Sequence, residues 1–143
     1  MREVDYMKKK HKIILGVLVV AIIGAYFGII GFKSYIETIE SNLDHLTDLN
    51  ISSVDISKVA DGTYVGSCEV FPITAEVKVT VKNHEIAGIE LVEHKSGRGA
   101  PAEIIPSKVV EAQTLQVDAV SGATYSSKVI LKAIENALNN ANK

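Results

Sequence analysis

A short polar stretch near the C-terminal end holds the side chains whose types and spacing are best suited to chemistry. Residues 118–127 read Asp-Ala-Val-Ser-Gly-Ala-Thr-Tyr-Ser-Ser, and the apolar spacing from Ser127 to about Leu138 predicts a helix directly after them. The free N–H groups and the positive dipole end of a helix N-terminus favour a phosphate. Gly122 permits a positive φ and a close approach of the backbone, and Ala123 adds little bulk. Thr124 would then present its hydroxyl where a phosphoryl group could be held.

The same residue types also have a purely structural use. Ser and Thr often cap helix N-termini by accepting a hydrogen bond from a backbone N–H group of the first turn. From the residue types alone, capping is the simpler interpretation of this stretch.

The order Asp-x-x-Ser-Gly-Ala-Thr at 118–124, followed by Ser126-Ser127, resembles the flavinylation motif of the FMN-binding domain family. That family includes the membrane-anchored flavoprotein subunits of the Rnf and Na+-translocating quinone reductase complexes and related extracytosolic electron carriers. The resemblance extends from about Asp61 to Leu138. It implies that Thr124 carries FMN through a phosphoester bond, which a flavin transferase forms with FAD as donor. The other motif residues that it assigns to the cofactor site are Asp118, Ser121, Gly122 and Ala123.

Three further side chains are candidates for contact with such a cofactor. Arg98 lies between two glycines in the loop 95–101, where its guanidinium and nearby backbone N–H groups could converge on an anion. An ordinary strand-to-helix loop is the alternative. Tyr125 follows Thr124 directly. His94 could hydrogen-bond a flavin, although a surface histidine at a strand end is the simpler interpretation.

The sequence contains no recognisable hydrolytic centre or metal site. The histidines are scattered, and Cys68 is the single cysteine, so no internal disulfide is possible. No Cys/His spacing suits zinc, and no Gly-x-Gly-x-x-Gly fingerprint follows a strand. We therefore predict no catalytic residues and no metal. An electron-transfer flavoprotein or an oxidoreductase subunit is expected rather than a stand-alone enzyme.

An uncharged run covers residues 13–32 and would rise about 30 Å as a helix, enough for a bilayer core. It is longer than the apolar region of a signal peptide and lacks a good cleavage site, which favours an uncleaved anchor. Residues 1–12 carry a net charge of +3 and the remainder carries −5. The positive-inside rule places the N-terminus in the cytoplasm and the rest outside. A mildly acidic domain without a basic stripe argues against nucleic acid as a partner.

The rest of the chain predicts a stalk and one small α+β domain. An apolar stripe in residues 33–58 predicts a helical stalk that ends in a polar linker from Asn50 to Ser57. The same stripe could instead pack against the domain or lie at the membrane surface. The domain, residues 59–143, begins with a strand near Asp61. Clean alternation over Ile73–Lys82 predicts a half-buried strand.

The second half of that domain is predicted from turn and helix signals. Asn83-His84 is a plausible two-residue turn into a third strand, Glu85–His94. A helix from Glu103 to Gln113 would tolerate Pro106 only in its first turn. The expected fold is a small antiparallel sheet with packed helices.

Together these features predict a membrane-anchored extracytosolic flavoprotein that transfers electrons. Its expected partners are the membrane, a flavin transferase for maturation, and redox partner proteins or a quinone-linked membrane complex. Two alternatives stay open: a non-redox ligand-binding or sensor module, and an accessory subunit of a membrane complex.

Overall fold

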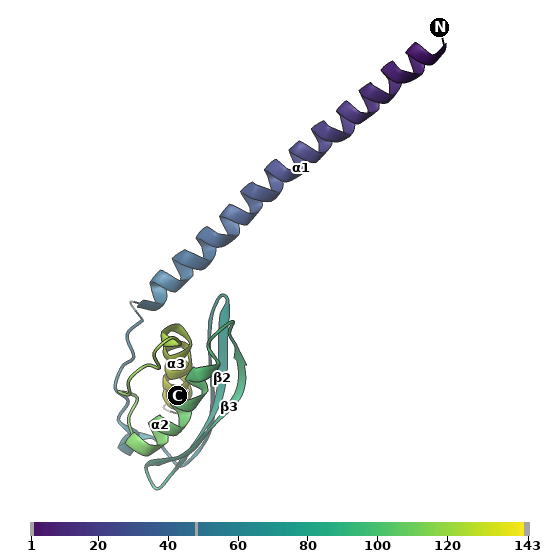
Figure 1. Ribbon diagram of the computed structural model, residues 1–143. Helices are drawn as coiled ribbons and strands as arrows, with labels where there is room; N and C mark the ends of the chain where they lie inside the picture. The colour runs from purple at the N-terminus through teal and green to yellow at the C-terminus, as the bar shows by residue number, and fades with distance from the viewer. Residues whose placement is uncertain (1, 48, 142–143) are drawn as a thin grey trace. The chain divides into compact units, whose positions relative to one another are not determined.

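The computed structural model describes residues 2–47 and 49–141 (Figure 1). The chain forms two compact units, Met1–Thr38 and Ile39–Lys143. Helix α1 runs from Arg2 to Thr47, and its stretch Ile14–Ile39 is long and apolar enough to cross a membrane. A signal sequence near the N-terminus would meet the same criteria. The helix continues past the predicted span without a break because residues 33–47 contain neither Gly nor Pro.

The second unit is built on a three-stranded antiparallel sheet. Its strands are β1 (Gly62–Val70), β2 (Ile73–Lys82) and β3 (Glu85–Lys95), with β2 in the centre. The side chains of β2 alternate as predicted. Those on the buried face are Ile73, Ala75, Val77, Val79 and Val81.

The predicted turn between β2 and β3 is confirmed. Asn83 and His84 both have a positive φ, 54° and 60°. This is the conformation of a two-residue hairpin turn whose twist matches that of the flanking strands.

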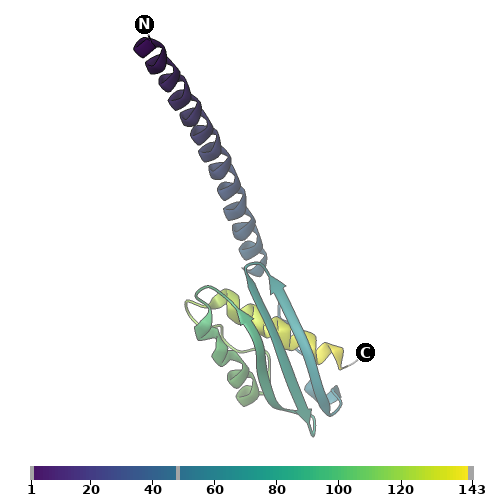
Figure 2. The same cartoon turned by 90° about the vertical axis from the view of Figure 1, so that its right-hand side faces the viewer.

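Two helices cover one face of the sheet: α2 (Ile105–Ala112) and α3 (Thr124–Asn140) (Figures 1 and 2). This arrangement confirms the α+β fold. Helix α2 is shorter than predicted because a 3-10 helix, η2 (Ala100–Ile104), precedes it and Gln113 ends it with a left-handed φ of 52°. Pro106 lies in the first turn, where its missing N–H costs nothing.

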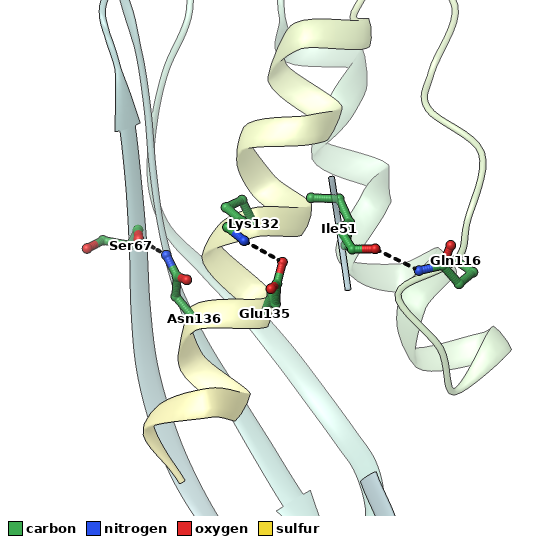
Figure 3. A network of polar contacts seen from close by, with 6 residues as sticks. All are labelled: Ile51, Ser67, Gln116, Lys132, Glu135 and Asn136. Carbon is green, nitrogen blue, oxygen red and sulfur yellow. Dashed lines mark hydrogen bonds and ion pairs between the residues drawn. The ribbon is translucent and has the colours of Figure 1, made fainter. Parts of the chain in front are cut away.

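Helix α3 packs closely on the edge strand β1. A Cβ on Gly66 would lie 2.7 Å from Ala137 Cα, so only glycine fits between strand and helix. Asn136 Nδ2 donates to Ser67 O at 2.9 Å (Figure 3), and Asn140 Nδ2 donates to Val65 O at 3.2 Å. These two bonds satisfy backbone carbonyls on the outer edge of β1, where no further strand could pair with them.

The last turn of α1 and the chain that follows it pack against the core of the second unit, where the sequence had predicted the end of a stalk and a polar linker. Leu46 is fully buried, which contributes about 1.5–3 kcal/mol. Lys128 Nζ donates to Leu46 O at 3.0 Å, and Gln116 Nε2 donates to Ile51 O at 3.1 Å (Figure 3). We call Leu46 together with residues 49–56 the strap. Its apolar side chains that join the core are Leu46, Leu49, Ile51, Val54 and Ile56.

Candidate functional site

The N-terminus of α3 begins at Thr124, three residues earlier than the sequence predicted. The N-cap residue is Ala123, which has no side chain able to cap, and the first helical hydrogen bond joins Ser127 N to Ala123 O at 2.9 Å. Thr124 is therefore the first residue of the helix and does not precede it. The N–H groups of Thr124, Tyr125 and Ser126 have no acceptor within the helix, as is general for a first turn.

The hydroxyl groups near this N-terminus do not cap it, so the capping interpretation of the Ser/Thr cluster is not supported. Ser127 is buried and bonds the preceding turn instead. Its Oγ accepts from Val120 N at 3.0 Å and donates to Ala123 O at 2.9 Å. Gly122, in the same turn, has a φ of +78°, in the left-handed region that the sequence analysis foresaw. The role of Ser127 was not predicted, because a hydroxyl four residues after a carbonyl has no distinctive sequence signature.

The start of α3 faces a second loop across an open pocket of about 190 Å³. The loop contributes Ser96–Gly99, and the turn and helix contribute Gly122–Ser126. Pro72 and Ile73, at the start of β2, supply apolar surface. A Cβ on Gly99 would lie 2.6 Å from Ser126 Cβ, so the absence of a side chain at Gly99 lets the loop approach the helix.

The pocket brings together five of the eight residues that the sequence analysis named as candidates for cofactor contact: Arg98, Gly122, Ala123, Thr124 and Tyr125. Thr124 and Arg98 are both exposed. The arrangement therefore offers the hydroxyl of the exposed Thr124, one guanidinium and the N–H groups of a helix start to an anionic ligand.

Asp118 and Ser121 are not among the residues that line this pocket. Asp118 instead lines two other depressions, one of them, about 360 Å³, with Ile51 and Lys128. Within residues 2–47 and 49–141, Asp118 accepts no hydrogen bond, so the structure does not show it ordering the turn. The part of the predicted site that precedes Gly122 thus faces different surroundings from the part that follows it.

The side chain of His94 is buried, which corrects the expectation of a surface histidine. The register between β2 and β3 shifts between Glu76 and Val77, so that His94 pairs with Ala75 on the buried face. Its side chain is 2% exposed, and Nδ1 lies 3.0 Å from Glu103 Oε1. Nε2 has no hydrogen-bond partner among the described residues.

Cys68 lies half-buried on β1. Burial raises the pKa of its thiol, which keeps it protonated and poorly nucleophilic. Across the described part of the chain, no three His, Cys, Asp or Glu side chains are grouped so that they could hold a metal ion.

Comparison with known proteins relates this region to a flavin-binding family. Residues 72–139 match the sequence profile of the FMN-binding domain family, a range that contains every residue of the pocket described above. Among curated proteins, the NADH:acrylate oxidoreductase of Vibrio harveyi is 38% identical to this chain over 65 residues. That alignment covers 43% of this chain and 6% of the relative, so the chain spans a small part of that protein. These similarities support a flavin-binding redox role.

Proposed function

Residues 72–139 belong to the FMN-binding domain family, and from this premise we propose that the protein is a membrane-anchored flavoprotein with FMN attached covalently to Thr124. The observation that carries the proposal is the position of Thr124. It is the exposed first residue of α3, in a pocket that also contains Arg98.

The residues around the pocket fit the chemistry of FMN. The N–H groups at the start of α3 and the Arg98 guanidinium suit a phosphate. Pro72, Ile73 and Tyr125 provide surface for the carbon skeleton of the ligand. Thr124 is the first residue of α3, so an ester between its hydroxyl and the phosphate would leave the phosphate at the helix start.

Attachment would proceed by phosphoryl transfer from FAD. Thr124 Oγ1 forms a bond to the phosphorus of the FMN half, the pyrophosphate P–O bond breaks, and AMP leaves. The hydroxyl proton passes to a base of the flavin transferase, because the part of the chain that the structure describes places no His, Asp or Glu in the pocket lining. The domain itself supplies the acceptor and its orientation.

The size of the pocket suits an electron carrier. At about 190 Å³ it is smaller than the roughly 300–1,000 Å³ of sites that enclose drug-sized ligands. Only part of FMN would be enclosed, and the rest would stay accessible to a partner. Bound FMN supplies one- and two-electron transfer, while the protein supplies position and surroundings. We therefore propose redox proteins or a quinone-linked membrane complex as partners.

The apolar part of α1 would anchor the domain. The stretch Ile14–Ile39 would cross the membrane once, with the basic N-terminal residues in the cytoplasm and the domain outside. Protease added to intact cells should then remove the domain and spare the N-terminus. A mature protein that lacks residues 13–32 would show that this run is a cleaved signal.

The test of covalent attachment is co-expression of the full chain with a flavin transferase. The wild-type protein should remain fluorescent in a denaturing gel and gain the mass of one FMN phosphoester. Thr124→Ala should lose both signals, whereas Thr124→Ser should keep them because it retains the hydroxyl. Ser121→Ala is the matched control, since this exposed serine lies in the same turn outside the pocket. A label that persists in Thr124→Ala on Ser121, Ser126 or Ser127 would refute the assignment.

A second experiment tests electron transfer. The flavinylated protein should be reduced by a chemical reductant and reoxidised by an acceptor, with little specific turnover of NADH alone. Rapid, saturable NADH oxidation by the isolated protein would make it an enzyme in its own right. If no redox partner changes the flavin state, the ligand-binding or sensor function becomes the better proposal.

A further inference from the structure

The His94–Glu103 pair closes the base of the loop that forms one side of the pocket. His94 is near the end of β3, and Glu103 belongs to η2, nine residues later. Since an ionised carboxylate only accepts hydrogen bonds, Nδ1 of His94 donates to Glu103 Oε1 across 3.0 Å. The intervening residues include Ser96–Gly99, which line the pocket.

A continuous series of contacts leads from Glu103 to the start of α3. The N–H group of Ala102, the residue before Glu103, donates to Gly99 O at 2.9 Å, and Ala102 is fully buried. Gly99 in turn packs against Ser126, with no room for a Cβ between them. Helix η2 also packs against α3. A displacement of Glu103 would therefore move Gly99, and Arg98 beside it, relative to the first turn of α3.

The buried imidazole costs stability that an apolar residue would not. Its side chain is 2% exposed and its Nε2 has no partner among the described residues, so a polar atom is buried without compensation. A phenyl ring has a similar shape and would remove this penalty. The Glu103 side chain is 53% exposed, so loss of its partner would leave it solvated. Packing alone therefore does not account for a histidine at this position.

We propose that His94, acting through Glu103, is a positioning residue that holds the Ser96–Gly99 side of the pocket against the start of α3. This inference rests on the proposed function only for its flavin readout, because the position of the loop can be measured without a cofactor.

The experiment uses the full-length protein in detergent and separates stability from site geometry. His94→Phe keeps the ring and removes both nitrogens, and His94→Asn keeps a donor near the place of Nδ1. Glu103→Ala removes the acceptor, and Glu103→Gln keeps a neutral one. Because the sequence has no Trp, thermal unfolding is followed by circular dichroism. The rate of flavin attachment by the transferase is measured on the same samples.

If His94 positions the loop, removing its donor should change the rate of flavin attachment without lowering the unfolding temperature. His94→Phe should unfold at the wild-type temperature or above it, yet attach flavin about tenfold more slowly, since small displacements at a reacting group have large effects on rate. Glu103→Ala should slow attachment equally, and the double variant should be no slower than either single one. His94→Asn and Glu103→Gln should attach flavin at close to the wild-type rate.

Glu90→Ala is the matched control, because Glu90 is also a part-exposed carboxylate paired with a basic group, Lys78, at 3.1 Å, but on β3 away from the pocket lining. Its attachment rate should not change. In the flavin-free protein, the NMR signals of the Gly97, Arg98 and Gly99 amides should shift in His94→Phe and Glu103→Ala and stay in place in Glu90→Ala.

Two results would overturn the inference. One is a His94→Phe variant that unfolds at a lower temperature but attaches flavin normally, which would make His94 a structural residue. The other is a set of loop amides that do not move in any variant. If the wild-type protein itself takes no flavin, the proposed function fails, and the amide signals alone decide whether His94 positions the loop.

Discussion

Both ends of α3 border an open pocket, but they contact the rest of the domain in different ways. Near the C-terminal end, Ala133 and Ala137 lie directly on Gly66, and Asn136 bonds the edge of β1 (Figure 3). The N-terminal end has no side-chain cap and opens onto a pocket. Most of the helix is packed into the domain, and only its first turn presents N–H groups that have no acceptor within the helix. A site that needs free backbone donors can exist on this helix because the opposite end holds it in place.

The comparison predicts that Gly66→Ala has the largest effect of any single methyl group on stability. The new Cβ would collide with backbone atoms of Ala133 and Ala137, which cannot move without displacing α3. We expect a loss of about 3 kcal/mol in the free energy of unfolding, measured by urea denaturation. Gly88→Ala is the control, because a Cβ there meets no atom within 4 Å. Equal stabilities of the two variants would show that α3 is not held at Gly66.

A glycine-to-alanine substitution at Gly99, which packs against the first turn of α3, should impair flavin attachment more than it destabilises the fold. Gly99→Ala places a methyl group against the Ser126 side chain and pushes the loop away from α3. We expect flavin attachment to slow by about tenfold or more while the domain stays folded. Gly97→Ala, two residues earlier in the loop with open space around its Cβ, should attach flavin normally. A Gly99→Ala protein that unfolds like Gly66→Ala would remove the distinction between the two ends.

Gly122→Ala should have a smaller effect on the free energy of unfolding. At this position the cost of backbone strain can be measured apart from that of a steric clash. Its φ is +78°, but a Cβ would meet no atom within 4 Å. Gly122→Ala should therefore cost about 1–2 kcal/mol from backbone strain alone, measured by thermal or urea unfolding. Gly122→Asn should cost less, because asparagine tolerates the left-handed region better than alanine. A Gly122→Asn variant as unstable as Gly122→Ala would contradict strain as the cause.

The smallest effect is expected for the side-chain bond at the edge of β1. Asn136→Ala removes the donor to Ser67 O and should cost about 1 kcal/mol in the free energy of unfolding. Asn139→Ala is the control, since Asn139 is exposed on the same helix turn. Flavin attachment should be unchanged in both. A reduced attachment rate in Asn136→Ala would show that the two ends of the helix are coupled.

Much of the fold was predictable because its signals are local. The alternation in β2, the Asn83-His84 turn and the place of Pro106 follow from the period of a strand, the twist of a hairpin and the ring of proline. The start of α3 was placed too late because Ser126 and Ser127 are typical capping residues, whereas the actual N-cap, Ala123, is not.

The surroundings of the site were less predictable because they depend on contacts between distant segments. The burial of His94 follows from a register shift in the β2–β3 pairing, which strict alternation of the sequence cannot reveal. The approach of Arg98 and Thr124 to one pocket depends on Gly99 packing against α3. Asp118 was assigned to the cofactor through its motif, and the structure places it in two other depressions.

Packing of the strap limits where a protease can release a stable domain from the membrane anchor. A cut between Ile51 and Val54 would separate Leu46 from the core that it fills. The released fragment would carry the equivalent of a large-to-small core substitution, which typically costs about 2–5 kcal/mol. It would also lose the bonds that Lys128 and Gln116 make to the strap. Cleavage that yields a stable free domain must therefore fall on the N-terminal side of Leu46, so part of α1 would leave with the domain.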